Sequence, residues 1–575
     1  MNFNILRRVS RIAAIGAILL GSASCVYVNE ELGQNLIPTD QKWDVFNPEA
    51  VVLEDIQLHT ADSLSAYNSN RFTFGAISDP LFGTSMKSTS FTLIPLSDSL
   101  DFGKNTKVRQ FHLSALLDTV STYNESQTRI LQNVYVSELK TALDTMALYT
   151  GTFMDPANRA KYLDTENRIT TGVPVYDGGD SLSFDFSIDF AERLIKKLDK
   201  KKLDSIDVYT GIFPGIYIET DTPVVEGGRI NMFDLKLQRN SDYYITGNYA
   251  ELKVTADYGD RTAVDTSFLF LFGSGTLMTQ DILKTGQVPA QFAFNASSHQ
   301  TIEEDFTAKW NAGTKDKMYV EGGSGMKPVV TAKEIKAIVH NLIAEAGITD
   351  PRDVVINKAS IILPYEMPAD YKNLDKYPTI LSPTVKLHGE DGGYVTYAGL
   401  TDSSVQSEDQ GDINRSTFMY SPDISHHVQM ILNLDEADEN FEKNISKYDI
   451  WMLIMHDETI KKATNSNTTN DLYNSLLYSS YYNNMMYGGY GGYGGYGYGG
   501  YGYGGYGYDS YGYGYNNYMN YMMMASMAGS YSTGEETERS LDKDRFYNAI
   551  LNGPGAAGEK PRLKITFSAP KTAEK

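Results

Sequence analysis

Short segments in which apolar and polar residues alternate recur through most of the chain, and they constrain its fold more than any other feature. Successive side chains of a β-strand point to opposite faces, so alternation indicates half-buried strands. Gly, Pro, Asn and Asp separate the segments, as in sandwich-like sheets rather than βαβ units. We therefore predict a mainly β fold of antiparallel, sandwich-like domains. The clearest alternating segments are 182–188, 206–208, 230–235 and 563–567, and 354–364 is a further predicted β stretch.

Two segments instead repeat apolar residues with the period of a helix, so we predict a few short helices. Phe190–Leu198 contains lysines near its end, which suit the C-terminus of a helix. Lys333–Ala346 is the stronger prediction, because Thr331 and Glu334 form a capping-box pattern before it. The apolar face of this helix should dock on a sheet. That face consists of Ile335, Ile338, Val339, Leu342 and Ile343, and Gly347 follows the last turn.

The alternation stops between Lys461 and Arg539. Tyr487–Tyr515 contains almost only Gly and Tyr, and Met519–Met527 is rich in Met. Glycine loses the most conformational freedom on ordering, and the tract offers almost no aliphatic side chains to bury. We predict a disordered Tyr/Gly/Met-rich insert at 461–540 between two strands. It is either a tolerated repeat expansion or an adhesive surface for a partner protein or a glycan.

The first 25 residues indicate export. Arg7, Arg8 and Arg11 precede the short apolar run Ile12–Leu20, which is too short to span a bilayer. Four small residues then lead to Cys25, the one cysteine of the chain. This arrangement resembles the lipobox of bacterial lipoproteins, in which the thiol is acylated, with palmitate for example, and becomes the new N-terminus. The alternative is an ordinary signal peptide that happens to contain a cysteine.

Removal of the signal would leave roughly 550 residues, enough for two or three domains. With Cys25 acylated, no thiol remains for a disulfide within the chain. We predict a lipoprotein signal peptide at 1–24, a tether at 25–50 and an N-terminal β-rich domain at 51–330. A C-terminal β-rich domain should combine 331–460 with 541–569, carry the docked helix 333–346 and be interrupted by the insert at 461–540.

Charge and motifs exclude several functions. The net charge is −22 and no basic cluster follows the signal, which argues against nucleic acid and against anionic lipid headgroups as ligands. We find no nucleophile elbow, P-loop or zinc-protease motif, and we predict no catalytic, metal or cofactor site. His426 and His427 are adjacent, and on a strand they would point to opposite faces. Carboxylates are abundant, but nothing selects two of them for catalysis.

Eight segments keep an order and a spacing that are together more specific than any single segment. Together they resemble the Bacteroidetes outer-membrane lipoprotein family catalogued as domain of unknown function 4270. The resemblance runs from about Gly33 to Phe567, leaves out the insert, and implies a β-rich lipoprotein with no assigned activity or catalytic residue. The segments are Gly75–Gly83, Asn133–Leu139, Phe213–Ile218, Tyr319–Gly325, Ile356–Pro364, Phe418–Ile424 with Val428-Gln429, Arg545–Gly553 and Leu563–Phe567.

These observations favour a non-enzymatic protein anchored by lipid in the outer membrane at the cell surface, as a structural or accessory subunit of an envelope or outer-membrane assembly complex. One alternative is a glycan- or nutrient-binding lipoprotein, since 41 tyrosines offer stacking surface. Another is a glycan hydrolase with carboxylates still to be identified. A flat apolar patch would favour the subunit of a complex. Exposed Trp and Tyr platforms would favour glycan binding, and a deep cleft would favour the enzyme. Asp-Ser/Thr triads resembling O-glycosylation sites of the phylum begin at Asp62, Asp98, Asp118, Asp180 and Asp204.

Overall fold

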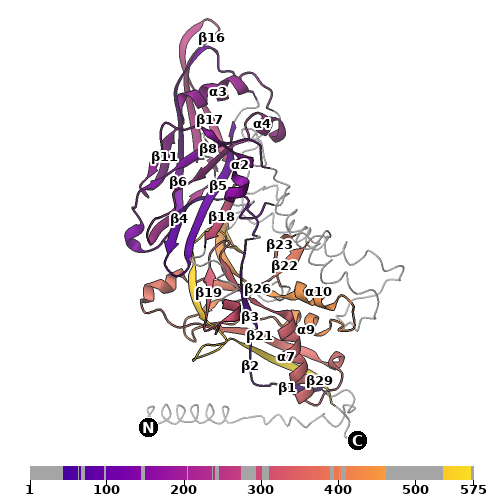
Figure 1. The fold of residues 1–575 in the computed structure, drawn as a ribbon. Coiled ribbons are helices and arrows are strands. Elements are labelled where there is room, and N and C mark those ends of the chain that lie inside the picture. Colours follow the sequence, from indigo (N-terminus) through magenta and orange to yellow (C-terminus); the bar gives the residue numbers. More distant parts are fainter. Residues whose placement is uncertain are drawn as a thin grey trace, which may run out of the picture.

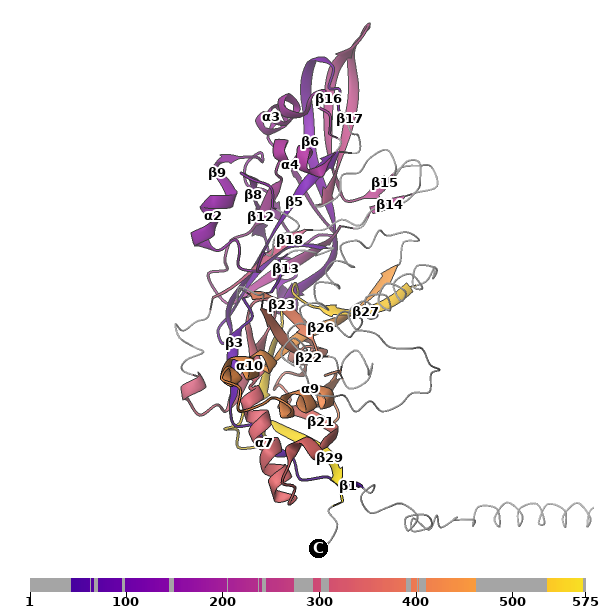
Figure 2. The same ribbon diagram turned by 90° about the vertical axis from the view of Figure 1, so that its right-hand side faces the viewer.

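The computed structural model is mainly β with a few short helices, as predicted. Every ladder between its named strands is antiparallel. The molecule is long: β16 (Tyr249–Tyr258) and β17 (Arg261–Gly273) form the tip at one end, and β1 (Trp43–Phe46) lies at the other (Figures 1 and 2). The structure describes residues 43–571 except 63, 67–70, 96–98, 144–148, 204, 236, 240–244, 274–292, 301–309, 389–393, 401, 403–409 and 462–534.

Six strands of the part that contains this tip pair in a closed circuit. Starting from β4, each pairs with the next in the order β4, β5, β17, β16, β6, β13, and β13 pairs back with β4. We call this circuit the strand ring. The remaining bounds are β4 (Arg71–Asp79), β5 (Gly83–Pro95), β6 (Lys104–Thr122) and β13 (Gly227–Asp234). Flanking strands are β8 (Tyr135–Leu139), β9 (Leu163–Arg168), β11 (Ser181–Asp185), β12 (Ile216–Glu219) and β18 (Phe294–Gln300).

Phenylalanines from four strands of the ring meet in one core. The Phe233 ring stacks between Phe72 at 4.8 Å and Phe74 at 5.5 Å, measured between ring centroids. Phe91 and Phe272 continue the cluster, with their centroids 5.1 Å apart. We call this buried set, which also includes residues of α3 (Ile188–Leu198) and α4 (Ile206–Ile212), the phenylalanine core.

The other part of the molecule contains two six-stranded sheets covered by helices. One has the order β1-β29-β21-β25-β24 with β2 beside β29, and the other has the order β23-β22-β26-β20-β3 with β27 beside β26. Helices α7 (Ala332–Glu345) and α9 (Ser425–Leu432) pack here, on a core rich in Ile, Leu and Val that we call the aliphatic core. Bounds are β2 (Val51–Val52), β3 (Ile56–Thr60), β20 (Met326–Val330), β21 (Val355–Pro364), β22 (Ile380–His388), β23 (Tyr394–Gly399), β24 (Ile413–Asn414), β25 (Met419–Tyr420), β26 (Ile450–Lys461), β27 (Glu535–Leu541) and β29 (Arg562–Pro570).

Strand β29 lies between β1 and β21, with Leu563, Ile565 and Phe567 all buried. The predicted C-terminal strand is therefore central to its sheet.

The cores divide the chain differently from the boundary expected at residue 330. Leu53, Ile56, Met318 and Val320 precede that boundary, yet they belong to the aliphatic core. The tether is also shorter than expected, because β1 and β2 pair with β29. Phe46 explains the early start of the fold, since its ring stacks on Phe567 with centroids 5.2 Å apart. The chain thus begins in the aliphatic part, builds the strand ring and returns.

The two predicted helices are present, with one correction to the capping. Thr331 Oγ1 accepts a hydrogen bond from the Glu334 amide at 3.3 Å, as a capping box requires. The Glu334 carboxylate does not complete the box; it accepts from the amides of Glu54 and Asp55 instead. Glu334 therefore ties α7 to the segment that leads into β3.

One predicted strand is wrong. Ile206–Val208 forms the first turn of α4, where Ser205 Oγ accepts from the Val208 amide at 3.2 Å. Three alternating residues fit one helical turn as well as a strand, and the serine cap decides between them.

The predicted insert is framed by two paired strands. β26 and β27 are antiparallel neighbours, and Lys461 lies opposite Glu535. The limits 461 and 535–540 thus belong to strands, while 462–534 and its predicted disorder lie outside the described residues. Cys25, the signal peptide and the tether up to residue 42 lie outside them as well.

Candidate functional site

Three of the segments that carry the family resemblance meet between the strand ring and the aliphatic part. β19 (Lys317–Glu321) pairs with β28 (Asn548–Asn552), which places the segment 319–325 beside 545–553. Asn548 Nδ2 donates to Asp79 Oδ2 of the segment 75–83 at 3.3 Å. Phe82 and Tyr319 also meet edge to face, with centroids 5.4 Å apart. We call this meeting place, together with the buried polar residues around it, the polar joint.

A glycine-rich turn fits closely into the joint. Gly323 has φ +54°, and a Cβ there would come within 2.2 Å of Lys87 Nζ. A Cβ on Gly322 would lie 2.3 Å from the Arg545 carbonyl oxygen. Ser324 completes the turn, because its amide donates to Ser297 Oγ at 3.2 Å and its hydroxyl donates to the Ser297 carbonyl at 3.0 Å. The turn therefore needs residues without a side chain at 322 and 323.

Lys87 is the central cation of the joint and is buried. Its ammonium group donates to Ser297 Oγ at 2.8 Å and to the Lys543 carbonyl, so it links β5 and β18 of the ring part to the segment before β28. Burial lowers the pKa of Lys87 to about 8, although Asp544 and Asp542 oppose the shift. The ammonium group thus fastens the two parts of the molecule together.

A second buried group surrounds Glu321. Glu321 Oε2 lies 3.1 Å from His299 Nε2 and accepts from the Met326 amide at 2.7 Å. Lys327 Nζ donates to three backbone carbonyls, those of Glu321, Gly323 and Gly325, at 2.5, 3.1 and 3.0 Å. Burial raises the pKa of Glu321 and lowers that of Lys327. These bonds fix the glycine-rich turn from its inner side.

Ser85, His299 and Glu321 follow the order of a nucleophile, a base and an acid, but their geometry does not suit that chemistry. Ser85 Oγ is 3.4 Å from His299 Nδ1, which is longer than an effective O–H···N bond. Burial, with Lys327 and Lys87 nearby, lowers the pKa of His299 to about 4. A neutral imidazole with so low a pKa is a weak general base near pH 7. We assign these three residues to the structure of the joint.

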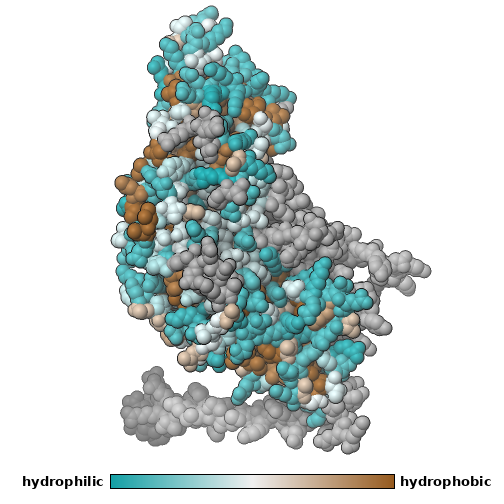
Figure 3. Space-filling model, in the orientation of Figure 1, coloured by the Kyte–Doolittle hydropathy of each residue, from teal (hydrophilic) through white to brown (hydrophobic). Residues whose placement is uncertain are grey.

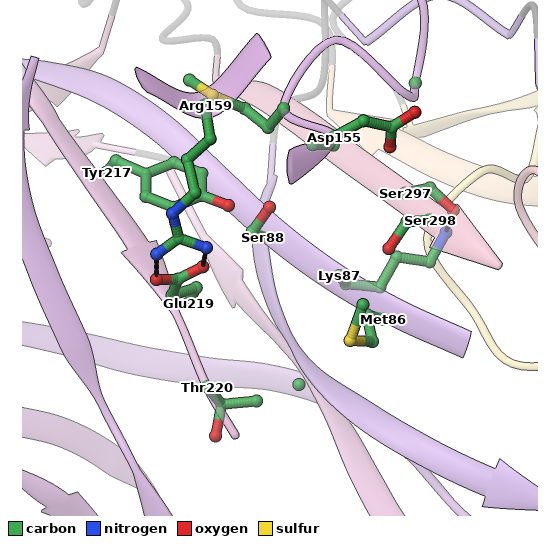
Figure 4. A pocket seen from close by; sticks show the side chains of 14 residues that line it. Met86, Lys87, Ser88, Asp155, Arg159, Tyr217, Glu219, Thr220, Ser297 and Ser298 are labelled. Atoms are coloured by element: carbon green, nitrogen blue, oxygen red, sulfur yellow. Dashed lines mark hydrogen bonds and ion pairs between the residues drawn. The ribbon is translucent and has the colours of Figure 1, made fainter. Parts of the chain in front are cut away.

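A small pocket opens beside the joint, between β5, β12, β18 and α2 (Pro156–Tyr162) (Figure 4). Its volume is about 90 Å³, well below the ~300–1,000 Å³ of typical ligand pockets. Arg159 faces Glu219 in a two-pronged ion pair next to Tyr217, so these two charges neutralise each other; Lys87 and Asp155 also line the pocket. The Arg159–Glu219 pair fastens α2 to β12, and the guanidinium group is therefore already engaged.

Four exposed aliphatic residues lie on neighbouring segments of the ring part. They are Leu131, Val175, Val224 and Val225, whose exposed fractions are 73%, 53%, 100% and 72%. Asn133 joins them: it pairs with Val175, its side chain donates to Asp221 Oδ2 at 2.5 Å, and its carbonyl accepts from Thr220 Oγ1 at 2.7 Å. We call Leu131, Val175, Val224 and Val225 the valine patch. The view in Figure 3 shows a largely hydrophilic surface with hydrophobic residues gathered in a few places.

The remaining candidates from the sequence are the adjacent histidines and the possible glycosylation triads. His427 lies on α9, not on a strand, and its Nε2 is 2.8 Å from the Tyr448 carbonyl oxygen. No cluster of three or more metal-ligating side chains occurs among the described residues. Among the possible glycosylation triads, Thr119 lies within β6, Leu182 is buried and Ser205 caps α4; Ser63, Asp98 and Asp204 lie outside the description.

None of the described helices is long and apolar enough to cross a membrane. Comparisons with protein-family models, with curated proteins and with solved structures find no match to this chain.

The polar joint was not foreseen as a site. Its glycines and Lys87 lie in segments that read as turns and alternating strands, and sequence periodicity does not say which segments meet. The one available signal was the resemblance itself, because three of the segments on which it depends meet at the joint. The valine patch has a weaker signal, the pair Val224-Val225 directly after Pro223 in a loop.

Proposed function

We propose that this protein is a non-enzymatic lipoprotein, anchored through acylated Cys25 in the outer membrane at the cell surface, and that it serves as a structural or accessory subunit of an envelope protein complex. The valine patch carries this proposal. Four aliphatic side chains, each more than half exposed, lie on a pair of short strands and on the loop that is hydrogen-bonded to it. Exposed apolar patches of this kind mark surfaces that bind other proteins.

The other described features favour the complex over the two alternatives. The pocket is small and its arginine is already paired, which does not suit hydrolysis of a glycan. Glycan binding usually depends on several exposed aromatic rings in one site. The exposed aromatic residues Trp43, Tyr371 and Phe418 lie on separate elements, whereas the residues of the valine patch are all aliphatic. The partner should therefore be a protein that presents an apolar surface of its own.

The test compares protein partners captured from native membranes by cross-linking and affinity purification. Leu131→Asp combined with Val225→Asp should abolish capture of the partner while leaving the thermal midpoint nearly unchanged, because exposed substitutions typically cost less than ~0.5 kcal/mol. Val208→Asp is the matched control, since Val208 is an exposed valine in the first turn of α4, away from the patch. Identical partners in wild type and double variant would overturn the assignment of the patch.

The anchor is tested separately. Cys25→Ala should remove the acyl group and release the protein from the membrane fraction, because no other cysteine exists to replace it. Retention of the variant in the pellet after a carbonate wash would contradict lipid anchoring.

A further inference from the structure

The outer face of the sheet at the N-terminal end of the molecule combines exposed apolar residues with lysines. Val45 of β1 and Val355 of β21 both lie opposite Ser568 of β29, so the three form one row across the sheet. Trp43 lies opposite Pro570 on the same side. Because side chains alternate, this side faces away from Leu563, Ile565 and Phe567, which enter the aliphatic core.

Two lysines continue this face toward the middle of the sheet. Lys358 lies opposite Thr566, and Lys564 is the next outward position on β29; both are exposed. We call Trp43, Val45, Val355, Lys358 and Lys564 the basal face. Trp43, Val45 and Val355 are 46%, 65% and 49% exposed.

The charge of the basal face differs from that of the whole protein. The chain carries −22, yet the outward positions of β1, β2, β21 and β29, all within the described residues, contain no carboxylate. Arg562 is a third cation on this side, and it forms an ion pair with Glu559 at 2.6 Å. Net charge alone suggested that anionic headgroups would be repelled, but a local surface of lysines beside apolar side chains attracts them.

The position of the face identifies what covers it. β1 lies at the opposite end of the molecule from the β16–β17 tip (Figures 1 and 2). The stretch from Cys25 to Trp43 spans at most about 60 Å when fully extended, so an acylated Cys25 would hold this end close to the bilayer. Tryptophan favours the boundary between headgroups and acyl chains, and lysine favours anionic headgroups.

We propose that the basal face rests on the membrane, with Trp43, Val45 and Val355 at the acyl–headgroup boundary and Lys358 and Lys564 on anionic phospholipid headgroups. This inference rests on the proposed lipid anchor and adds a specific contact between the folded protein and the lipid.

The experiment uses the full acylated protein in vesicles of phosphatidylcholine and phosphatidylglycerol, with and without bromine on the acyl chains. The chain has three tryptophans, and Trp43→Phe gives the emission of the other two. We expect brominated lipid to quench the Trp43-dependent emission about twofold or more, because the ring would lie at the depth of the upper acyl chain.

Lys358→Glu combined with Lys564→Glu should remove most of that quenching while the protein stays in the vesicle fraction. Lys104→Glu combined with Lys107→Glu is the matched control, because both are exposed lysines on β6 of the strand ring. An unquenched Trp43 in the acylated wild type, or quenching that is unaffected by the reversal at 358 and 564, would overturn the proposal.

Mass spectrometry of the same sample shows whether Cys25 is acylated, which separates the two proposals. An unacylated chain would overturn the anchor, and the quenching measurement repeated on that chain with added vesicles would still decide whether the basal face contacts lipid.

Discussion

The phenylalanine core and the aliphatic core are built by different means. The strand ring closes on itself, so side chains of its strands, together with those of α3 and α4, must fill the core, and stacked rings such as Phe72, Phe74 and Phe233 supply much of the volume. The aliphatic core lies beneath helices, and branched side chains of α7 such as Ile335 and Val339 interdigitate with those of the strands. The stability of the closed sheet thus depends on the volume of the side chains inside it. The stability of the open sheets depends on the helices that cover them.

The polar joint separates the two cores. Lys87 and Glu321 are buried there and hold the two parts through polar contacts, with Ser297 and the Lys543 carbonyl and with His299. The apolar contacts across the joint are small: Phe82 meets Tyr319, and Phe546 packs on Ile77 and Ile230. We therefore expect the cores to respond separately to substitution. The chain supplies a convenient probe, because Trp43, Trp310 and Trp451 all lie in the aliphatic part and report its unfolding alone.

The largest expected effect comes from truncation after Pro554, which removes β29. Full burial of Leu563, Ile565 and Phe567 contributes roughly 1.5–3 kcal/mol each, a large share of the ~5–15 kcal/mol of a typical domain. Tryptophan emission and protease resistance of the aliphatic part should be lost, while the strand ring stays folded. Truncation after Pro570 is the control and should change neither. Full protease resistance after removal of β29 would show that the strand is dispensable.

Phe233→Ala should have the next largest effect, and it should destabilise the phenylalanine core instead of the aliphatic core. The substitution empties the space between the Phe72 and Phe74 rings, at a cost of about 3–5 kcal/mol. Hydrogen exchange should accelerate in β4 and β13, with the tryptophan transition unchanged. Phe233→Leu fills much of the space and should cost less. If the tryptophan transition moved by the same amount, the two cores would be one cooperative unit.

Acid should lower the stability of the aliphatic part, because it contains the buried imidazole of His427. Burial lowers the pKa of this fully buried imidazole to about 4, from an ordinary value of 6.5. The unfolded chain therefore binds a proton below pH 6.5 that the folded chain does not bind until about pH 4. Stability should fall by roughly 3 kcal/mol across that interval. Denaturant titrations followed by tryptophan emission at pH 7 and pH 4.5 measure this fall. In His427→Gln the fall in stability between these two pH values should be smaller than in wild type. A variant as acid-sensitive as wild type would exclude His427 as the cause.

Deletion of Tyr487–Tyr515 should have the smallest effect. The strands that frame the insert pair directly with each other, so a shorter connection changes only the closure entropy, by about 0.4 kcal/mol in favour of folding. Thermal midpoints of both cores should stay within error of wild type. A large drop in either midpoint would mean that the tract packs against that core.

The sequence allowed the local elements to be predicted better than their neighbours. The strand at 563–567 and the helices near 190 and 335 were found because a repeated period and a cap are local signals. Closure of the ring was not predictable, because the contact of β17 with β5 joins Phe270 to Pro95 across a long stretch of chain. The joint was missed for a related reason: Lys87 is buried by β18, the turn at Gly323 and the segment 542–548, which are far from it in the sequence.

The pairing of Lys461 with Glu535 has a practical consequence for anyone who wishes to modify this protein. Antiparallel partners stand about 5 Å apart at their Cα atoms, whatever is spliced between them. A folded module whose own termini lie close together could replace the natural tract without straining either strand. The end of this hairpin is thus a ready attachment point for a reporter or a binding domain, leaving Cys25 and the basal face untouched.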